Sequence, residues 1–260
     1  IGNMTRVATD EKGGQTFEEG DEISVYAWTG DATVAPETRE RVVNNAINKL
    51  TNGSWISNPQ MLWKNNRDKH YFIGVYPISA ISDLSAGEYT FDETKQVESD
   101  LLVAVNKDGL SYNADEQQTV PLTFTHVMAK LAVNLTYKNQ WGGIPTVEKV
   151  VVGNAAKEAT INYLTKVVTP STTAKEDFSL PEITENTKYV SVIIPQEDVK
   201  QLTIVIGGKN FVYDNGTPFK LESGKITTVN LEVGRDEIKL GDVKITNWED
   251  GSTFSGEALN

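Results

Sequence analysis

Residues 120–137 read VPLTFTHVMAKLAVNLTY, and this stretch decides the fold. In its second part apolar residues alternate with polar or small ones, and one face collects Leu131, Val133, Leu135 and Tyr137. Ahead of His126 the same alternation is made by Val120, Leu122 and Phe124. A period of two is typical of a half-buried β-strand and not of a helix. Since the stretch lies near the middle of the chain, we predict that it opens the second of two β-domains.

Strand-like runs fill the rest of the chain. Gly, Asn and Pro separate the runs, and helical periodicity is almost absent. The pattern predicts an all-β fold of two Greek-key β-sandwich domains in tandem. The predicted strands are residues 22–28, 71–76, 101–105, 147–152, 160–163, 189–195, 201–206, 211–213, 217–221, 225–233 and 243–248.

Residues 37–50 fit two patterns. Their apolar positions could share one face of a helix that begins after Pro36, or the segment could be a strand. Asn52-Gly53, directly after the segment, is a strong signal for a hairpin turn. We therefore favour a strand that ends near Thr51.

The length of the chain bounds the number of domains. A chain of 260 residues comfortably forms two domains of roughly 100–150 residues each. Residues 106–119 are polar and poor in apolar side chains, which is typical of a domain boundary. We expect an N-terminal sandwich at residues 1–118 and a C-terminal sandwich at residues 119–260.

The composition excludes several classes of partner and chemistry. The formal net charge of −12 argues against nucleic acid and against an anionic membrane surface as partners. No apolar run reaches the length of about 18 residues that a membrane-spanning helix needs. The absence of cysteine excludes disulfides, thiolate zinc sites and a cysteine nucleophile. Because the first residue is Ile1, we expect a mature or trimmed chain, with any signal peptide or lipid-attachment cysteine upstream.

Candidate catalytic or metal-binding residues are few. The only histidines are His70, in a polar loop, and His126, and neither has a second ligand at the spacing of a zinc site. We expect His126 to be a structural residue near the domain junction, hydrogen-bonded by backbone or a polar side chain. The carboxylates of residues 18–22 lack the spacing of a calcium loop, so we expect a solvated turn there. No nucleophile elbow, phosphate loop or dinucleotide fingerprint is present, so we predict no enzymatic activity and no cofactor.

Several short motifs follow one another in a specific order. They include FEEGDEISVY at residues 17–26, NGSW at residues 52–55, LTFTHVMAKL at residues 122–131, IIPQ at residues 193–196 and ITNWEDG at residues 245–251. In this order, over nearly the whole chain, the motifs resemble the fimbrillin-like family. That family contains type V pilus subunits and related surface lipoproteins of Gram-negative anaerobes.

The resemblance implies transthyretin-like β-sandwich domains, a lipoprotein precursor and assembly into surface fimbriae. We therefore expect a non-enzymatic fimbrial subunit or adhesin component at the cell surface, incorporated in fimbriae or anchored in the outer membrane by an upstream lipid. Its expected partners are other fimbrial subunits, through β-strand addition, and surface ligands of host or bacterial cells. The alternative is a carbohydrate-binding surface lipoprotein that uses exposed rings of Trp28, Trp55 and Trp248 beside carboxylates.

The resemblance also bears on processing and assembly. An Arg-directed protease removes an N-terminal strand from the family's pilins, and Arg6 is the candidate by position, but we favour an uncleaved arm on which Arg6 is only a polar residue. The donor strand of stalk pilins is C-terminal, so Val243, Ile245 and Trp248 are candidates for assembly contacts. Only the first two of these make an apolar face, and residues 249–260 suit a loose end. We therefore expect residues 243–248 to pair within their own domain, which favours a tip, accessory or stand-alone role over a stalk role.

Overall fold

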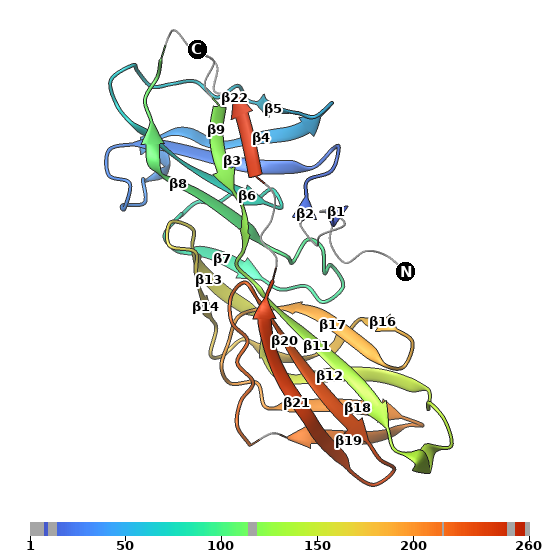
Figure 1. Ribbon diagram of the computed structural model, residues 1–260. Helices are drawn as coiled ribbons and strands as arrows, with labels where there is room; N and C mark the ends of the chain where they lie inside the picture. The colour runs from blue at the N-terminus through green and yellow to red at the C-terminus, as the bar shows by residue number, and fades with distance from the viewer. Residues whose placement is uncertain (1–7, 10–14, 114–118, 215, 249–252, 258–260) are drawn as a thin grey trace.

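The computed structural model of the protein describes residues 8–9, 15–113, 119–214, 216–248 and 253–257. These residues confirm the all-β prediction. Their strands form two halves stacked along one long axis, with β3 to β6 in the first half and β11, β12 and β17 to β21 in the second (Figure 1). The helical elements of this part of the chain are two short 3-10 turns, η1 (Thr38–Glu40) and η2 (Asn139–Trp141).

The first half is built on a six-stranded sheet. Its strand order is β10 (Thr125–His126), β8 (Leu102–Leu110), β6 (His70–Tyr76), β3 (Glu22–Thr29), β4 (Arg41–Thr51) and β5 (Ser54–Asn58). The central strand β3 carries apolar side chains on both faces, so both faces of the sheet require cover. From Arg41 onward the segment at residues 37–50 is the predicted strand rather than a helix, and η1 precedes it. Asn52 and Gly53 adopt positive φ angles of 51° and 73° and close the hairpin between β4 and β5.

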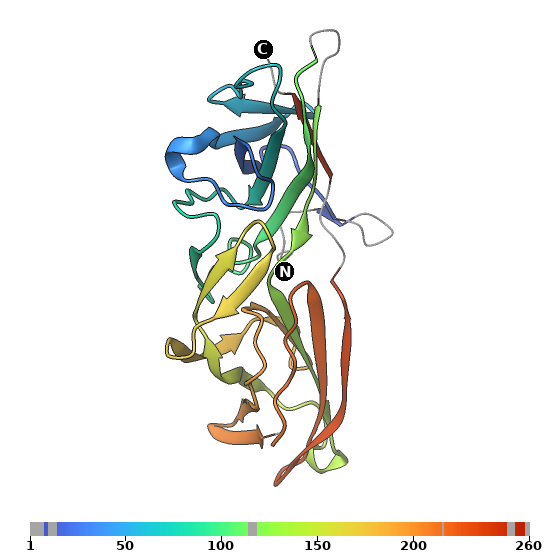
Figure 2. The ribbon, with the colours of Figure 1, turned by 90° about the vertical axis from the view of Figure 1, so that its left-hand side faces the viewer.

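One face of this sheet packs against β9 (Thr119–Thr123). Val120, Leu122 and Phe124 form a buried cluster with Ile23 and Val25 of β3. β9 pairs antiparallel with β22 (Thr253–Glu257), and Figure 2 shows both strands along one side of the first half. A separate short hairpin is formed by β1 (Ala8–Thr9) and β2 (Gln15–Thr16).

The second half is a sandwich of a five-stranded and a four-stranded sheet. The five-stranded order is β16 (Glu182–Thr184), β17 (Lys188–Ile193), β11 (Ala129–Tyr137), β20 (Lys225–Val233) and β21 (Ile238–Asn247). The four-stranded order is β15 (Lys175–Leu180), β12 (Val147–Ala156), β18 (Gln201–Ile206) and β19 (Lys209–Asp214). β11 lies at the centre, antiparallel to β17 and parallel to β20, as its alternating pattern predicts for a half-buried strand.

The two halves exchange segments. β7 (Gly87–Thr90), from the early part of the chain, pairs with β13 (Glu158–Asn162), which also pairs with β14 (Val167–Pro170). Tyr26 and Trp28, on the second face of β3, belong to the same buried cluster as Ile81, Ile161 and the core of the second half. The hydrophobic core is therefore continuous from one half to the other.

The predicted domain boundary between residues 118 and 119 stays a prediction. The chain does not pass from one half to the other at that point. Residues 119–126, which we assigned to the second domain, lie on the first half, because their apolar face is the cover that β3 requires. The predicted boundary segment is partly strand, since β8 continues to Leu110. Residues 217–221 form only an isolated bridge between Leu221 and Gln196. The expected loose end contains β22.

Replacing Gly74 with alanine tests how closely β9 packs on the sheet. A Cβ at this position would lie 2.6 Å from Phe124 Cζ and 3.0 Å from Leu122 Cδ1. We expect Gly74→Ala to lower the unfolding free energy by about 1–3 kcal/mol, as overpacking does. Gly153→Ala is the matched control, because its nearest neighbour is the flexible amide end of Gln201 at 3.0 Å. Chemical denaturation measures both variants, and equal losses would contradict the close packing of β9.

Candidate functional site

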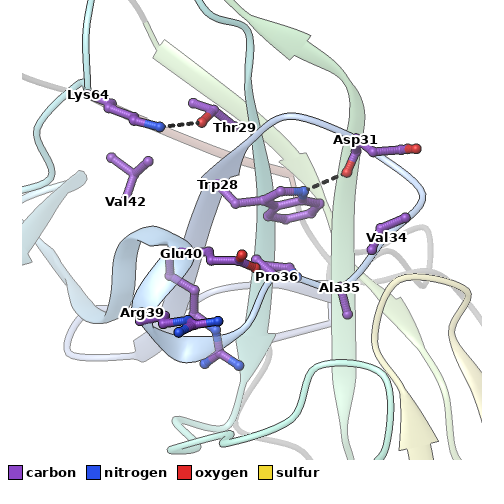
Figure 3. Close-up of a pocket in the computed structure, with 11 residues that line it drawn as sticks. Trp28, Thr29, Asp31, Val34, Ala35, Pro36, Arg39, Glu40, Val42 and Lys64 are labelled. Atoms are coloured by element: carbon purple, nitrogen blue, oxygen red, sulfur yellow. Dashed lines mark hydrogen bonds between the residues drawn. The ribbon is translucent and has the colours of Figure 1, made fainter.

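A cavity of about 580 Å³ lies where the loop from β3 to β4 folds beside the end of β3 (Figure 3). Its lining mixes apolar and charged side chains, among them Trp28, Val34, Pro36, Arg39, Glu40 and Lys64. Such a mixture is the usual composition of a ligand site. The cavity is therefore the first place to look for binding or catalysis.

Several polar groups of this cavity have hydrogen-bond or ion-pair partners within the chain. Trp28 Nε1 donates to the carbonyl oxygen of Asp31 at 2.9 Å, and Lys64 Nζ donates to Thr29 Oγ1 at 3.2 Å. Arg39 Nε lies 2.8 Å from a carboxylate oxygen of Glu37. These contacts fix the loop to the strand.

Arg41 also lines the cavity and is buried. Its guanidinium donates to Asn44 Oδ1 at 2.9 Å and to the carbonyl oxygens of Ile81 and Ser82 at 2.6 and 2.7 Å. It lies 5.3 Å from the ring centre of Tyr26. Burial lowers the pKa of Arg41. The side chain therefore ties the segment after β6 to the sheet.

Asp31, a carboxyl group of the cavity, does not have the properties of the general acid of a glycosidase. Such a pair needs one acid whose pKa is raised so that it carries a proton. Hydrogen bonds from the hydroxyl and the backbone N–H of Thr33 lower the pKa of Asp31. Asp31 is therefore ionised at neutral pH, the opposite of what a general acid requires.

His126 lies at the junction of the two halves, at the end of β10. Its Nδ1 donates to Asp100 Oδ1 at 2.8 Å, and both side chains are buried. Its ring stacks on Trp248, with 3.8 Å between ring centroids and 12° between planes. Lys130 Nζ lies 3.9 Å from the centre of the Trp248 ring. The structure thus brings two of the predicted site residues, His126 and Trp248, into one cluster.

His70 does not lie in a polar loop as expected. It is the first residue of β6 and is buried. Nδ1 donates to the carbonyl oxygen of Asp68 at 3.1 Å, while Nε2 accepts the backbone N–H of Lys64 at 3.0 Å. The ring also meets the edge of Trp63, with 4.8 Å between centroids. Both nitrogens therefore hold the loop between β5 and β6. Because one nitrogen donates and the other accepts, the imidazole is neutral.

The tryptophan rings on which the carbohydrate-binding alternative depends are largely covered. Trp28 is 2% exposed and Trp248 is 4% exposed, so these two rings do not present a surface to sugars. Trp55 is partly buried and meets the edge of Phe17, with 5.2 Å between centroids. No specific observation among the described residues favours this alternative.

The acidic cluster at residues 18–22 forms a turn with structural contacts. Asp21 is buried and accepts the backbone N–H of Glu18 at 2.8 Å, and Glu19 accepts the backbone N–H of Asn52 at 2.9 Å. The cluster therefore fixes the start of β3 beside the hairpin of β4 and β5. Across the described residues, His, Asp and Glu side chains nowhere gather in threes as a metal site requires.

The assembly candidates Val243 and Ile245 lie on β21, the edge strand of the five-stranded sheet. They pair with Val229 and Thr227 of β20 and are 38% and 39% exposed. Residues 243–248 thus pair within the second half, as predicted, and the strand begins earlier, at Ile238. Arg6 lies outside the described residues.

The described residues form an all-β protein of two stacked halves that share a continuous hydrophobic core. In the described part of the chain neither helical turn is long or apolar enough to cross a bilayer. A family model described as fimbrillin-like matches residues 5–248. The chain belongs to the fimbrillin-like family, as the sequence motifs indicate.

Solved structures share the fold. A proposed cell adhesion protein from Bacteroides uniformis is 20% identical, with a TM-score of 0.70 over 90% of this chain and 93% of that chain. A second one, from Bacteroides ovatus, is 17% identical, with a TM-score of 0.65 over 93% and 90%. The tip fimbrial protein Mfa3 from Porphyromonas gingivalis, with a C-terminal truncation, is 11% identical, with a TM-score of 0.51 over 89% and 95%. A search of curated proteins finds no match to the chain.

Sequence reasoning missed the partners of His126. Asp100 precedes His126 by 26 residues and lies just before β8, and Lys130 follows on β11. Lys130 occurs within the motif at residues 122–131, but no spacing rule pairs it or Asp100 with a histidine. The sequence indicates only that a buried imidazole needs a hydrogen-bond partner. It does not specify which residue is that partner.

The burial of His70 predicts a pH dependence of stability. Burial is the main cause that lowers the pKa of His70 in the folded state. The unfolded chain therefore takes up this proton first, and the unfolding free energy falls as the pH drops below about 6.5, the unfolded value for histidine. We expect the difference in unfolding free energy between wild type and His70→Gln to shrink from pH 7.5 to pH 5. Denaturation curves across this range measure it, and a constant difference would contradict the neutral, buried imidazole.

Proposed function

We propose that the protein is a non-enzymatic fimbrial subunit at the cell surface, in a tip, accessory or stand-alone role rather than in the stalk. Its membership of the fimbrillin-like family supports the fimbrial part. The pairing of the two last described strands within the chain supports the choice of role: β21 pairs with β20 along its whole length, and β22 pairs with β9. A stalk subunit has to offer such a strand to a neighbour.

Other fimbrial subunits are the proposed partners, through β-strand addition to the sheet of β9 and β22. This sheet has two strands in the described structure, so its hydrogen-bonding edges are available. Pro121 removes one donor from β9, and its carbonyl oxygen accepts Asn106 Nδ2 at 3.3 Å. These features favour β22 as the edge at which a strand is added or exchanged.

The edge strand β21 is a poorer site for strand addition. Gly241 is an extra residue between the pairs of Leu240 with Leu231 and of Asp242 with Asn230, so the strand has a bulge. Lys239 and Lys244 are exposed on the same strand. Bulges and lysines are the features by which natural sheets prevent edge pairing. We therefore place assembly at the first half.

The proposed location is the outer surface of the cell, with anchoring in the outer membrane through an upstream lipid or incorporation in fimbriae. Surface ligands of host or bacterial cells are further candidate partners. The net charge of −12 argues against nucleic acid as a partner.

This role predicts that the purified chain stays monomeric, because its C-terminal strands are paired internally. Light scattering after gel filtration measures the mass, and electron microscopy detects filaments. On native cells, antibodies against the chain should label filament ends or isolated surface positions. Self-polymerisation, or even labelling along filament shafts, would show a stalk subunit and refute the proposed role.

Processing at Arg6 is a separate proposal. If an Arg-directed protease acts on the arm, chains from native surface material begin at Val7, and an Arg6→Lys variant begins further upstream. N-terminal sequencing of the native protein distinguishes the cases. A native chain that starts at Ile1 or earlier rules out cleavage at Arg6.

A further inference from the structure

Trp248 lies where the chain leaves the second half. It follows β21 directly, and its backbone N–H donates to the carbonyl oxygen of Gly224 at 2.9 Å. The next described strand, β22, pairs with β9 on the first half, as Figures 1 and 2 show. The indole therefore lies at the point from which the chain crosses between the halves.

The indole is packed between side chains from two different sheets. His126 belongs to β10 of the six-stranded sheet, and Lys130 belongs to β11 of the five-stranded sheet. The His126 ring is 3.8 Å from the indole, and Lys130 Nζ is 3.9 Å from it. Because both cannot occupy the space above one face at these distances, they lie on opposite faces. A single side chain thus contacts both halves, through stacking and a cation–π contact that burial strengthens.

Asp100 completes this cluster from a fourth segment. It precedes β8, and its carboxylate fixes the His126 ring by the hydrogen bond of 2.8 Å. Burial lowers the pKa of Lys130, and the charge of Asp100 opposes that shift. Buried charges are tolerated when they are paired and hydrogen-bonded. Each member of the cluster therefore depends on the others for its solvation.

The backbone at this junction is held by few hydrogen bonds, one of which runs from the N–H of Val127 to the carbonyl oxygen of Leu101 at 3.0 Å. β10 is two residues long and pairs only with β8 among the described strands. The link to β11 is Val127 and Met128, whose carbonyl oxygens accept Ser223 Oγ at 2.8 Å and the N–H of Gly224 at 2.9 Å. Gly224 has a φ of +66°, and a Cβ there would lie 3.2 Å from the carbonyl oxygen of His126. The tight turn at Gly224 thus binds both segments: its N–H group holds the link to β11, and its carbonyl oxygen holds Trp248.

We propose that Asp100, His126, Lys130 and Trp248 form a clasp that couples the junction of the two halves to the docking of β22 on β9. With the indole in place, the halves form one rigid body and the chain is directed toward β9. With the indole displaced, the packing at residues 127–128 loosens and β22 pairs with β9 less firmly. This inference concerns the chain alone and does not depend on the proposed fimbrial role.

Coupling of this kind is reciprocal. Loss of the indole must weaken the pairing of β22, and loss of β22 must weaken the packing of the indole by the same factor. A tryptophan that only filled core volume would lower the overall stability and produce neither effect. The two effects therefore distinguish a clasp from a core residue.

The first test is hydrogen–deuterium exchange of Trp248→Ala. We expect amide exchange at residues 119–123 and 253–257 to become about tenfold faster, while β12 and β18 keep their protection. Trp141→Ala is the matched control. Trp141 lies at the other end of β11, donates to the carbonyl oxygen of Val233 at 3.0 Å and has the guanidinium of Arg235 at 5.6 Å. The control should lose stability without faster exchange at β9 and β22.

Trp248→Phe provides a milder variant. Among the described residues the buried Trp248 Nε1 has no hydrogen-bond partner, so the residue acts through its ring faces, which phenylalanine largely keeps. We expect exchange at β9 and β22 within a few-fold of wild type for this variant. If exchange at β9 and β22 is as fast in Trp248→Phe as in Trp248→Ala, the ring faces are not the coupling contact.

The second test removes residues 253–260 and keeps the full cluster, so it remains informative if Trp248→Ala fails to fold. Exchange at residues 125–130 should become about tenfold faster.

A spin-label pair gives a third readout. Because the chain has no cysteine, Ser54→Cys and Asn210→Cys place one label on each half, and Trp248→Ala should broaden the distribution of distances between the labels. If Trp248→Ala and Trp141→Ala give equal exchange at β9 and β22, or if the truncated chain keeps wild-type exchange at residues 125–130, the proposal is wrong.

Discussion

The first half must cover both faces of one sheet, and most of the architecture follows from that constraint. β3 carries Ile23 and Val25 on one face and Tyr26 and Trp28 on the other, and all four are buried. Each such side chain left in water would forgo about 1.5–3 kcal/mol of hydrophobic stabilisation. β9 covers one face, and a segment that includes Ile81, with β7 and β13, lies on the other. Because these covers come from early, middle and late parts of the chain, the two halves cannot be separated at one point in the sequence.

Local patterns in the sequence predict the strands well where one face decides the structure. The alternation of Leu131, Val133 and Leu135 predicts β11, and the hairpin signal of Asn52-Gly53 predicts the end of β4. The same kind of pattern in β9 shows that Val120 and Leu122 need cover but not which half supplies it. The extension of β8 to Leu110 was not predictable either, because backbone pairing with β6 tolerates the polar residues of this segment. These misses concern long-range partners, which local periodicity does not encode.

The junction cluster shows the same limit at the level of side chains. A hydrogen-bonded His126 follows from the cost of burying an unpaired imidazole, whereas Asp100 as its partner does not. Trp248 stands beside Glu249 and Asp250 in the sequence, which favours a surface position. In the structure its faces are covered by His126 and Lys130, two groups that an indole accepts because its π-face is electron-rich. The burial of this ring therefore depends on residues that are close to it in space and not on its neighbours in the sequence.

The two last described strands differ in how firmly the chain holds them. β21 forms nine residue pairs with β20 and lies on a sheet whose other strands belong to the same core. β22 forms five residue pairs with β9, on a sheet of two strands. Local opening requires less free energy where fewer backbone hydrogen bonds and fewer neighbours are lost. β22 is therefore held less firmly than β21, and its opening requires less free energy than the unfolding of either half.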